Sequence, residues 1–373
     1  MFNLFLKRDG DRTIMYALID IPPFDTSSII ESFTRLVLEK EILYALDKTN
    51  AIQHYRLYVI ADGALDKEID MNLEIYQPEY RTLYPEAYSK EAEYAQPFLI
   101  DLESSTEFKE WFLEKGYGNS RGVYVLSTQD IDALANNIKD FTVGHMKEGN
   151  KETFFRFYDP KIFPTFLRIL CANQVTQIFA EQTYWLCENF VATEELDIFS
   201  YKNKKMYKCS HQLKPDNTPL CATTQKEYLT AKPKHDYHKT RTELVFEHGD
   251  IKLFSEAKEY IYVKQVCLSL IEQVSSLKEK QAKIKDIYKA VYTLVKEGIH
   301  EFGLTDKEVN YLWVVANTLH KDIRVLLRKD KRYAALFDTS NDISQTYKAR
   351  ILKEIIEGLE KISVKKEKKS EQE

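Results

Sequence analysis

The sequence predicts an α/β domain with a mixed sheet covered by helices, followed by a β-hairpin and loop segment and then by an all-α lobe. Short apolar runs alternate with helical patterns over about residues 10–190. Two β-like runs flank the turn at residues 202–204, as in a hairpin. From Phe254 onward, apolar residues recur at helical spacing. We therefore divide the chain into residues 1–192, 193–253 and 254–373.

The first elements of the α/β domain are two strands separated by a helix. Residues 13–20 are apolar and β-prone and end before Pro22 and Pro23, which predicts a buried strand. Residues 28–46 have helical spacing. Tyr55 to Ile60 predicts the next strand, ended by Asp62-Gly63, and Phe98 to Leu102 another.

A capping pattern then predicts a helix that starts near Ser104. Ser104-x-x-Glu107 is a capping box, because the two side chains can satisfy free amides at a helix start. Phe108, Trp111 and Phe112 follow on one helix face, and Gly116 is predicted as the left-handed end.

The second half of this domain continues the alternation. Gly122 to Leu126 predicts a strand, and Ser127-x-x-Asp130 opens a helix with an apolar face. Phe154 to Tyr158 predicts a further strand, and Asp159-Pro160 the start of a helix. Alternation along that strand would place Phe155 and Phe157 opposite Arg156 and Tyr158, and a half-buried Arg156 needs a partner.

The C-terminal lobe is predicted to contain about four helices. The spacing of Ile261, Val266, Leu270 and Val274 indicates one, and that of residues 284–294 a second that ends near Gly303. Thr305-x-x-Glu308 predicts a third N-terminus, and Asn341 or Asp342 could cap the last helix. The charged tail, Lys365 to Glu373, is expected to fray.

Composition predicts a soluble cytoplasmic protein. Hydrophobic residues make up 44% and charged residues 30% of the chain, and no apolar run reaches the ~18 residues that a membrane span needs. The five cysteines predict free thiols in a reducing compartment. Residues 1–192 carry 19 basic and 30 acidic residues. We expect no nucleic-acid and no membrane partner, because phosphate binding needs a concentrated basic surface.

Catalytic patterns in the sequence are weak. Gly118-Asn-Ser120-Arg-Gly122 matches the G-x-S-x-G pattern of an esterase elbow, which requires a strand before Ser120 and a helix after it. Here the predicted order is inverted. The same inversion argues against reading Gly116, Gly118 and Gly122 as a dinucleotide loop. We therefore expect no enzyme activity and no cofactor, with a hydrolase-like enzyme as the alternative.

One group of residues has the types that bind metal. It comprises Cys209, His211, Cys221, His235 and His238. Zinc takes four such ligands, usually from paired short spacings, but Cys209 and His211 are closer than usual and the rest lie in a polar segment. We expect unrelated side chains here and keep a metal-dependent enzyme as an alternative.

Several of these segments together resemble a known bacterial family. The residues that carry the likeness are 16–20, 83–84, 95–102, 111–118, 122–127 and the run Phe155-Arg-Phe-Tyr-Asp-Pro160. They resemble the N-terminal α/β domain of the type VI secretion effector chaperones, also called Tap or TEC adaptors. That domain was long catalogued as one of unknown function. The residues that match the family motif, expected to be structural, are Tyr16, Asp20, Pro97, Trp111, Gly116, Gly118, Gly122, Arg156, Phe157, Tyr158, Asp159 and Pro160.

The resemblance implies a non-catalytic cytoplasmic adaptor. Such proteins bind a toxic effector and help to load it onto the VgrG spike of the secretion apparatus. The C-terminal lobe is similar to the helical extension of many members, most of all from Glu301 to Glu308 and at Phe337-Asp338. A generic protein-binding scaffold is the further alternative, and the sequence does not identify the residues that bind a partner.

Overall fold

A computed structural model describes most of the chain. Over the described residues the chain divides into two compact units, with the boundary between Lys258 and Glu259. The described residues are 31, 33, 34, 37, 55–84, 96–147, 151–180, 182–189, 195–213, 226–227, 244–273, 284–319, 323–339 and 343–356. The strand predicted at 13–20, with Tyr16 and Asp20, lies outside them, and so does most of the helix predicted at 28–46.

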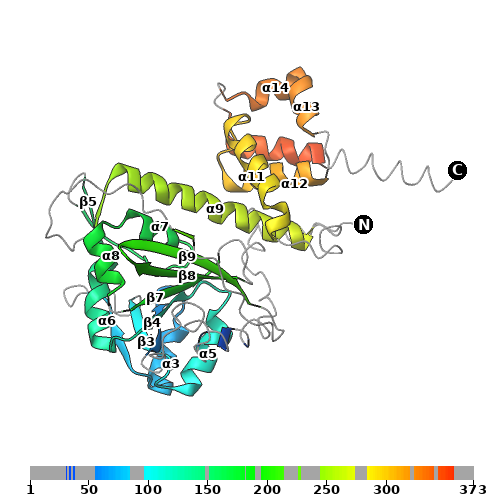
Figure 1. Ribbon diagram of the computed structural model, residues 1–373. Coiled ribbons are helices and arrows are strands. Elements are labelled where there is room, and N and C mark those ends of the chain that lie inside the picture. Colours follow the sequence, from blue (N-terminus) through cyan, green and yellow to red (C-terminus); the bar gives the residue numbers. More distant parts are fainter. Residues whose placement is uncertain are drawn as a thin grey trace. The chain divides into compact units, whose positions relative to one another are not determined.

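A large sheet forms the centre of the first unit (Figure 1). It has eight strands in the order β10-β9-β8-β7-β4-β1-β3-β2, and every neighbouring pair is antiparallel. The strands are β1 (Arg56–Asp62), β2 (Tyr80–Thr82), β3 (Pro97–Asp101), β4 (Gly122–Ser127), β7 (Tyr184–Glu188), β8 (Glu195–Lys202), β9 (Lys205–Gln212) and β10 (Lys226–Glu227).

Helices cover both faces of this sheet, and the side chains of β1 alternate between the two cores that result. Because side chains alternate along a strand, Leu57 and Val59 enter the core under α3 (Glu68–Tyr76) and α5 (Thr106–Gly116). Tyr58 and Ile60 enter the core of the opposite face. That core includes residues of α6 (Ile131–Ile138), α7 (Phe163–Ile169) and α8 (Ala172–Ile178). Burial on both faces explains the continuous apolar runs in the sequence.

A small second sheet completes the first unit. It has the order β11-β5-β6, with β5 (Val143–Met146) after the short 3₁₀ helix η4 (Lys139–Thr142), β6 (Lys151–Phe154) and β11 (Leu244–Phe246). β11 is parallel to β5, and β6 is antiparallel to it.

The α/β class predicted from the sequence is confirmed, and mixed pairing occurs in the small sheet alone among the described strands. The alternation of strands and helices predicted from the sequence corresponds to a crossover between two strands that are not neighbours. β3 and β4 both run antiparallel to β1, which lies between them, so they share one direction and α5 crosses from one to the other. Sequence alternation therefore predicts the crossover and not the pairing of neighbours.

The predicted hairpin is β8 and β9, joined by Asn203 and Lys204. Both turn residues have positive φ, 52° and 60°, as a two-residue turn between right-twisted strands requires. The hairpin belongs to the large sheet through β7. Cys221, His235 and His238, from the polar segment that follows, lie outside the described residues.

Several predicted helix ends are displaced. Ser105, and not Ser104, caps α5 by accepting a hydrogen bond from the Phe108 amide. Gly116 is the last residue of α5, and the left-handed glycine is Gly118, with φ 82°. The helix predicted from Pro160 begins at Phe163. The shifts are of one to three residues, and helix ends are the part of an element that the local sequence resolves least.

The second unit is helical over its described residues, as predicted. α9 (His248–Gln273) runs across the boundary, and α11 (Ile284–His300), α12 (Lys307–Leu319), α13 (Ile323–Lys329), α14 (Lys331–Phe337) and a helix at 345–356 follow. Trp313 is fully buried, packs against Phe302 with 4.6 Å between ring centroids, and donates a hydrogen bond to the Leu294 carbonyl. Asp306 caps α12 in place of the predicted Thr305, and Ser344 accepts a hydrogen bond from the Tyr347 amide at the start of the last helix.

Candidate functional site

The family-motif run from Phe155 to Pro160 forms a turn. β6 ends at Phe154, so the predicted strand to Tyr158 is wrong, as is the alternation expected for it. Phe157 and Tyr158 are both fully buried. The physical reason is that the chain must turn here to place two consecutive aromatic rings in one core and then enter α7.

An ion pair joins this turn to the end of β1. Arg156, which the sequence predicts to need a partner, donates through Nη2 to Oδ2 of Asp62. Oδ1 of Asp62 accepts hydrogen bonds from the amides of Ala64 and Leu65, at 3.1 and 3.3 Å. Burial raises the pKa of Asp62, whose residue is only 1% exposed, and the Arg156 guanidinium opposes part of that rise. The pair therefore stabilises a carboxylate that would otherwise be costly to bury.

Aromatic packing surrounds this ion pair. The Phe157 ring lies 5.0 Å from that of Phe166 and 6.3 Å from that of Trp185. The Tyr84 ring packs against that of Phe154 with 4.7 Å between centroids, and burial raises the pKa of Tyr158 well above its usual value. The arrangement locks the turn onto the sheet, and its described side chains are engaged in packing and ion pairing.

Asp159 and Pro160 shape the entry to α7. Oδ1 of Asp159 accepts a hydrogen bond from the Lys161 amide at 2.9 Å, and its carbonyl accepts from the amides of Ile162 and Phe163 at 2.8 Å. Asp159 thus caps the turn before α7, and Pro160 fits a turn position that needs no amide donor.

The glycine-rich segment after α5 is a helix-to-strand turn. Ser120 lies between α5 and β4 with φ 55°, so the strand–serine–helix order of an esterase elbow is not present there. The Gly118 amide donates to Oε1 of the buried Glu188 at 2.9 Å. A Cβ on Gly122 would lie 2.2 Å from the Ile60 carbonyl oxygen, so only glycine fits at this close approach of β4 to β1.

The remaining described motif residues also have structural contacts. Pro97 begins β3, and its carbonyl accepts a hydrogen bond from the Leu83 amide at 3.0 Å. Trp111 is half-buried and packs beside Phe108, with 5.5 Å between ring centroids.

Only two members of the Cys/His group fall in the described part of the chain. Cys209 is buried in β9, and His211 follows two residues later on the same strand face. Burial lowers the pKa of His211. Among the described residues there is no group of three or more His, Cys, Asp or Glu side chains placed to hold a metal ion. The metal alternative stays a prediction for all five residues, because Cys221, His235 and His238 lie outside the described part of the chain.

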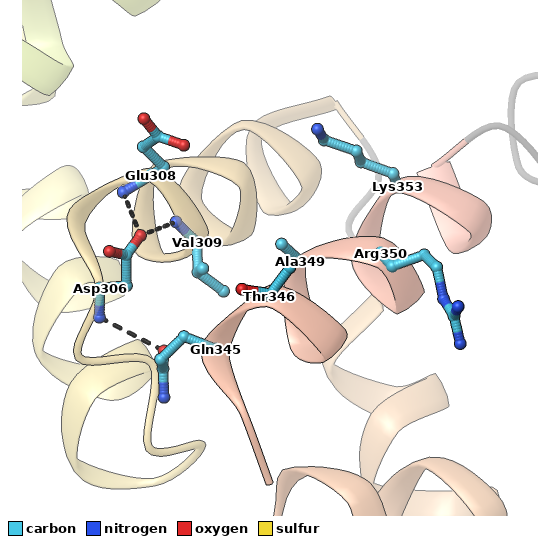
Figure 2. A pocket seen from close by; sticks show the side chains of 8 residues that line it. All are labelled: Asp306, Glu308, Val309, Gln345, Thr346, Ala349, Arg350 and Lys353. Carbon is cyan, nitrogen blue, oxygen red and sulfur yellow. Dashed lines mark hydrogen bonds between the residues drawn. The ribbon is translucent and has the colours of Figure 1, made fainter. Parts of the chain in front are cut away.

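A groove of about 400 Å³ lies in the helical unit, between the start of α12 and the helix at 345–356 (Figure 2). Gln345 holds its two walls together, because it accepts from the Asp306 amide and donates to the Gly303 carbonyl. The residues that line the groove are Asp306, Glu308, Val309, Gln345, Thr346, Ala349, Arg350 and Lys353.

The two walls of this groove carry opposite charges. Asp306 and Glu308 come from the α12 side, and Arg350 and Lys353 from the facing helix, where the Arg350 side chain points away from α12 (Figure 2). The Arg350 guanidinium also stacks on the Tyr347 ring at 4.6 Å. A groove with a carboxylate wall, a cationic wall and small residues suits a protein segment that carries both charges. The sequence indicated these helices, but the pairing of their faces depends on tertiary packing.

Comparison with known protein families identifies a match in the α/β unit. Residues 57–177, from β1 into α8, match a family described as a domain of unknown function (DUF4123). This family is associated with adaptors of type VI secretion effectors. No curated protein and no solved structure matches the chain. None of the helices in the described part of the chain is long and apolar enough to cross a bilayer.

Proposed function

We propose that the chain is a non-catalytic cytoplasmic adaptor that binds a type VI secretion effector and helps to load it onto the VgrG spike. The observation that carries the proposal is the DUF4123 match over residues 57–177, a family linked to such adaptors. The matched segment includes the Asp62–Arg156 pair, which joins β1 to the turn before α7, and Gly122, where β4 closely approaches β1. Those contacts support the role of a rigid platform.

In this proposal the helical unit selects the cargo. The groove between α12 and the helix at 345–356 offers charges of both signs to a segment of the effector. Specificity in such grooves comes from matched charges on the partner, because wrong partners place like charges together.

Affinity capture from the native bacterium tests the adaptor role. The tagged chain, cross-linked in cells that carry an active secretion system, should recover a VgrG spike protein and a toxin encoded near it, identified by mass spectrometry. A tagged unrelated cytoplasmic protein of similar size and charge serves as the control. Recovery of neither protein above that control, from cells in which the chain is folded and abundant, would contradict the proposal.

A further inference from the structure

Helix α3 presents two large apolar side chains to solvent. Met71 is 52% exposed and Ile75 is 60% exposed. They lie four residues apart, so they share one face of the helix. The opposite face supplies Ile69 and Leu73 to the core, so the exposed pair is not needed to anchor α3 on the sheet.

Carboxylates outnumber basic residues around this apolar pair. α3 contains Glu68, Asp70 and Glu74 and no lysine or arginine, and its N-cap residue, Lys67, is the one basic side chain at its start. Acidic residues in the first turn favour a helix, but Glu74 lies near the C-terminal end, where the helix dipole favours a cation. Helix stability therefore does not explain the charge of this face.

The neighbouring helix on the same side of the sheet extends the negative surface. α5 contacts α3 and exposes Glu107, Glu110 and Glu114. Its two lysines leave α5 with a net negative charge as well. Met71 and Ile75 thus lie in a region where negative charge predominates.

We infer that this α3 face, defined by Glu68, Met71, Glu74 and Ile75, docks a cationic amphipathic helix of a partner protein. The inference rests on the proposed adaptor function, since it supplies one of the surfaces that such a function needs. A helix with an apolar stripe between lysines or arginines matches an apolar pair between carboxylates. Methionine adapts to partners of different shape. The same carboxylates would repel an anionic lipid surface.

A model peptide tests the chemistry directly. The probe is an 18-residue amphipathic helix of leucine and lysine, and the same peptide with glutamate in place of lysine is its counterpart. Calorimetric titration of the full chain should show one binding site for the lysine peptide, weakened by added salt, and none for the glutamate peptide. The double variants Met71→Ser with Ile75→Ser, and Glu68→Lys with Glu74→Lys, should each weaken binding about tenfold or more.

A matched variant on another exposed helix surface separates a docking site from general charge attraction. Ile251→Ser with Glu256→Lys, on α9 of the same unit, changes one exposed apolar and one exposed acidic residue. It should leave the affinity within about twofold of the original chain. Circular dichroism confirms that each variant is folded. Absence of binding, or equal effects of all three variants, would overturn the inference.

The capture experiment distinguishes this inference from the proposed function. If the original chain recovers toxin and spike and the α3 variants recover both equally well, the docking face is refuted and the adaptor role stands. If the original chain recovers neither, the adaptor role is refuted, and with it the biological premise of the docking face. Loss of one partner alone in the α3 variants would support both and identify which protein carries the cationic helix.

Discussion

Asp62 and Arg156 connect two segments that lie 94 residues apart in the chain. Asp62 is almost fully buried, whereas the Arg156 side chain is 42% exposed. The two partners are therefore not equivalent. Loss of Asp62 leaves an arginine that can turn toward water, but loss of Arg156 leaves a buried carboxylate without its cation.

Arg156→Met should lower the free energy of unfolding by about 1–3 kcal/mol at pH 7, because the two backbone amides on Asp62 only partly replace the guanidinium. Burial already raises the folded-state pKa of Asp62 above its unfolded value, and without Arg156 this pKa rises further. The folded protein then binds the additional proton, so the variant should lose stability as the pH rises through that folded pKa.

Urea unfolding of four proteins at pH 5 and pH 8 measures this effect. They are the original chain, Arg156→Met, Asp62→Asn and the double variant. The double variant should be more stable than Arg156→Met at pH 8, since it buries no unpaired charge. If Arg156→Met were as stable at pH 8 as at pH 5, relative to the original chain, the ion pair would not be what stabilises Asp62.

Gly122→Ala should destabilise the sheet by about 2–3 kcal/mol or prevent folding, because the new Cβ would overlap the Ile60 carbonyl oxygen in the adjacent strand. Gly249→Ala is the matched control. A Cβ there meets no atom within 4 Å, and in a helix alanine should be neutral or stabilising by up to about 1 kcal/mol. Thermal unfolding measures both variants, and similar midpoints would refute the steric explanation for Gly122.

At the scale of the element, local sequence patterns predicted individual strands and helices better than they predicted which strands pair. β1, β3, β4, α6 and the β8–β9 hairpin follow from apolar runs, caps and turn residues that lie within a few positions of each other. The small sheet could not be predicted in this way, because β11 pairs with β5, about 100 residues earlier in the chain, and neither strand shows clear alternation. α3 was missed as well, since its exposed Met71 and Ile75 obscure the helical pattern.

Lys204→Gly should stabilise the β8–β9 hairpin. Lys204 has φ 60°, which costs a side-chain-bearing residue about 1–2 kcal/mol and glycine almost nothing. Part of this gain is lost to the greater freedom of glycine in the unfolded chain, so we expect a net gain of about 0.5–1 kcal/mol. The free energy of unfolding measures it.

The adjacent lysine is the control for this substitution. Lys205→Gly falls in β9, where glycine should instead be destabilising. Equal changes in both variants would mean that the backbone angle at Lys204 does not limit stability.

At the scale of the whole molecule, the sequence predicted an α/β domain and a helical lobe but not their binding surfaces. Arg156 could be recognised as needing a partner, yet nothing local indicated that Asp62 supplies it. The groove in the helical unit combines residues 306–309 with residues 345–353, and their proximity depends on how α12 packs against the last helix. Surfaces built from distant segments are the part of a site that sequence patterns do not show.

The division of roles between the units leads to a prediction about cargo. Arg350→Glu with Lys353→Glu makes both walls of the groove acidic, so an effector segment that carries both charges should lose its acidic contacts and meet repulsion. Quantitative capture should show about tenfold or greater loss of the toxin, with recovery of the spike unchanged.

Lys329→Glu with Lys331→Glu is the matched control, because both lysines are exposed in the same unit and neither lines the groove. It changes the net charge equally and should preserve capture of both partners. Equal loss of toxin in the two double variants would indicate long-range charge attraction in place of a specific groove. Selective loss in the groove variant would place cargo recognition in the helical unit, because the same chain would still engage the spike through a surface that the substitutions leave intact.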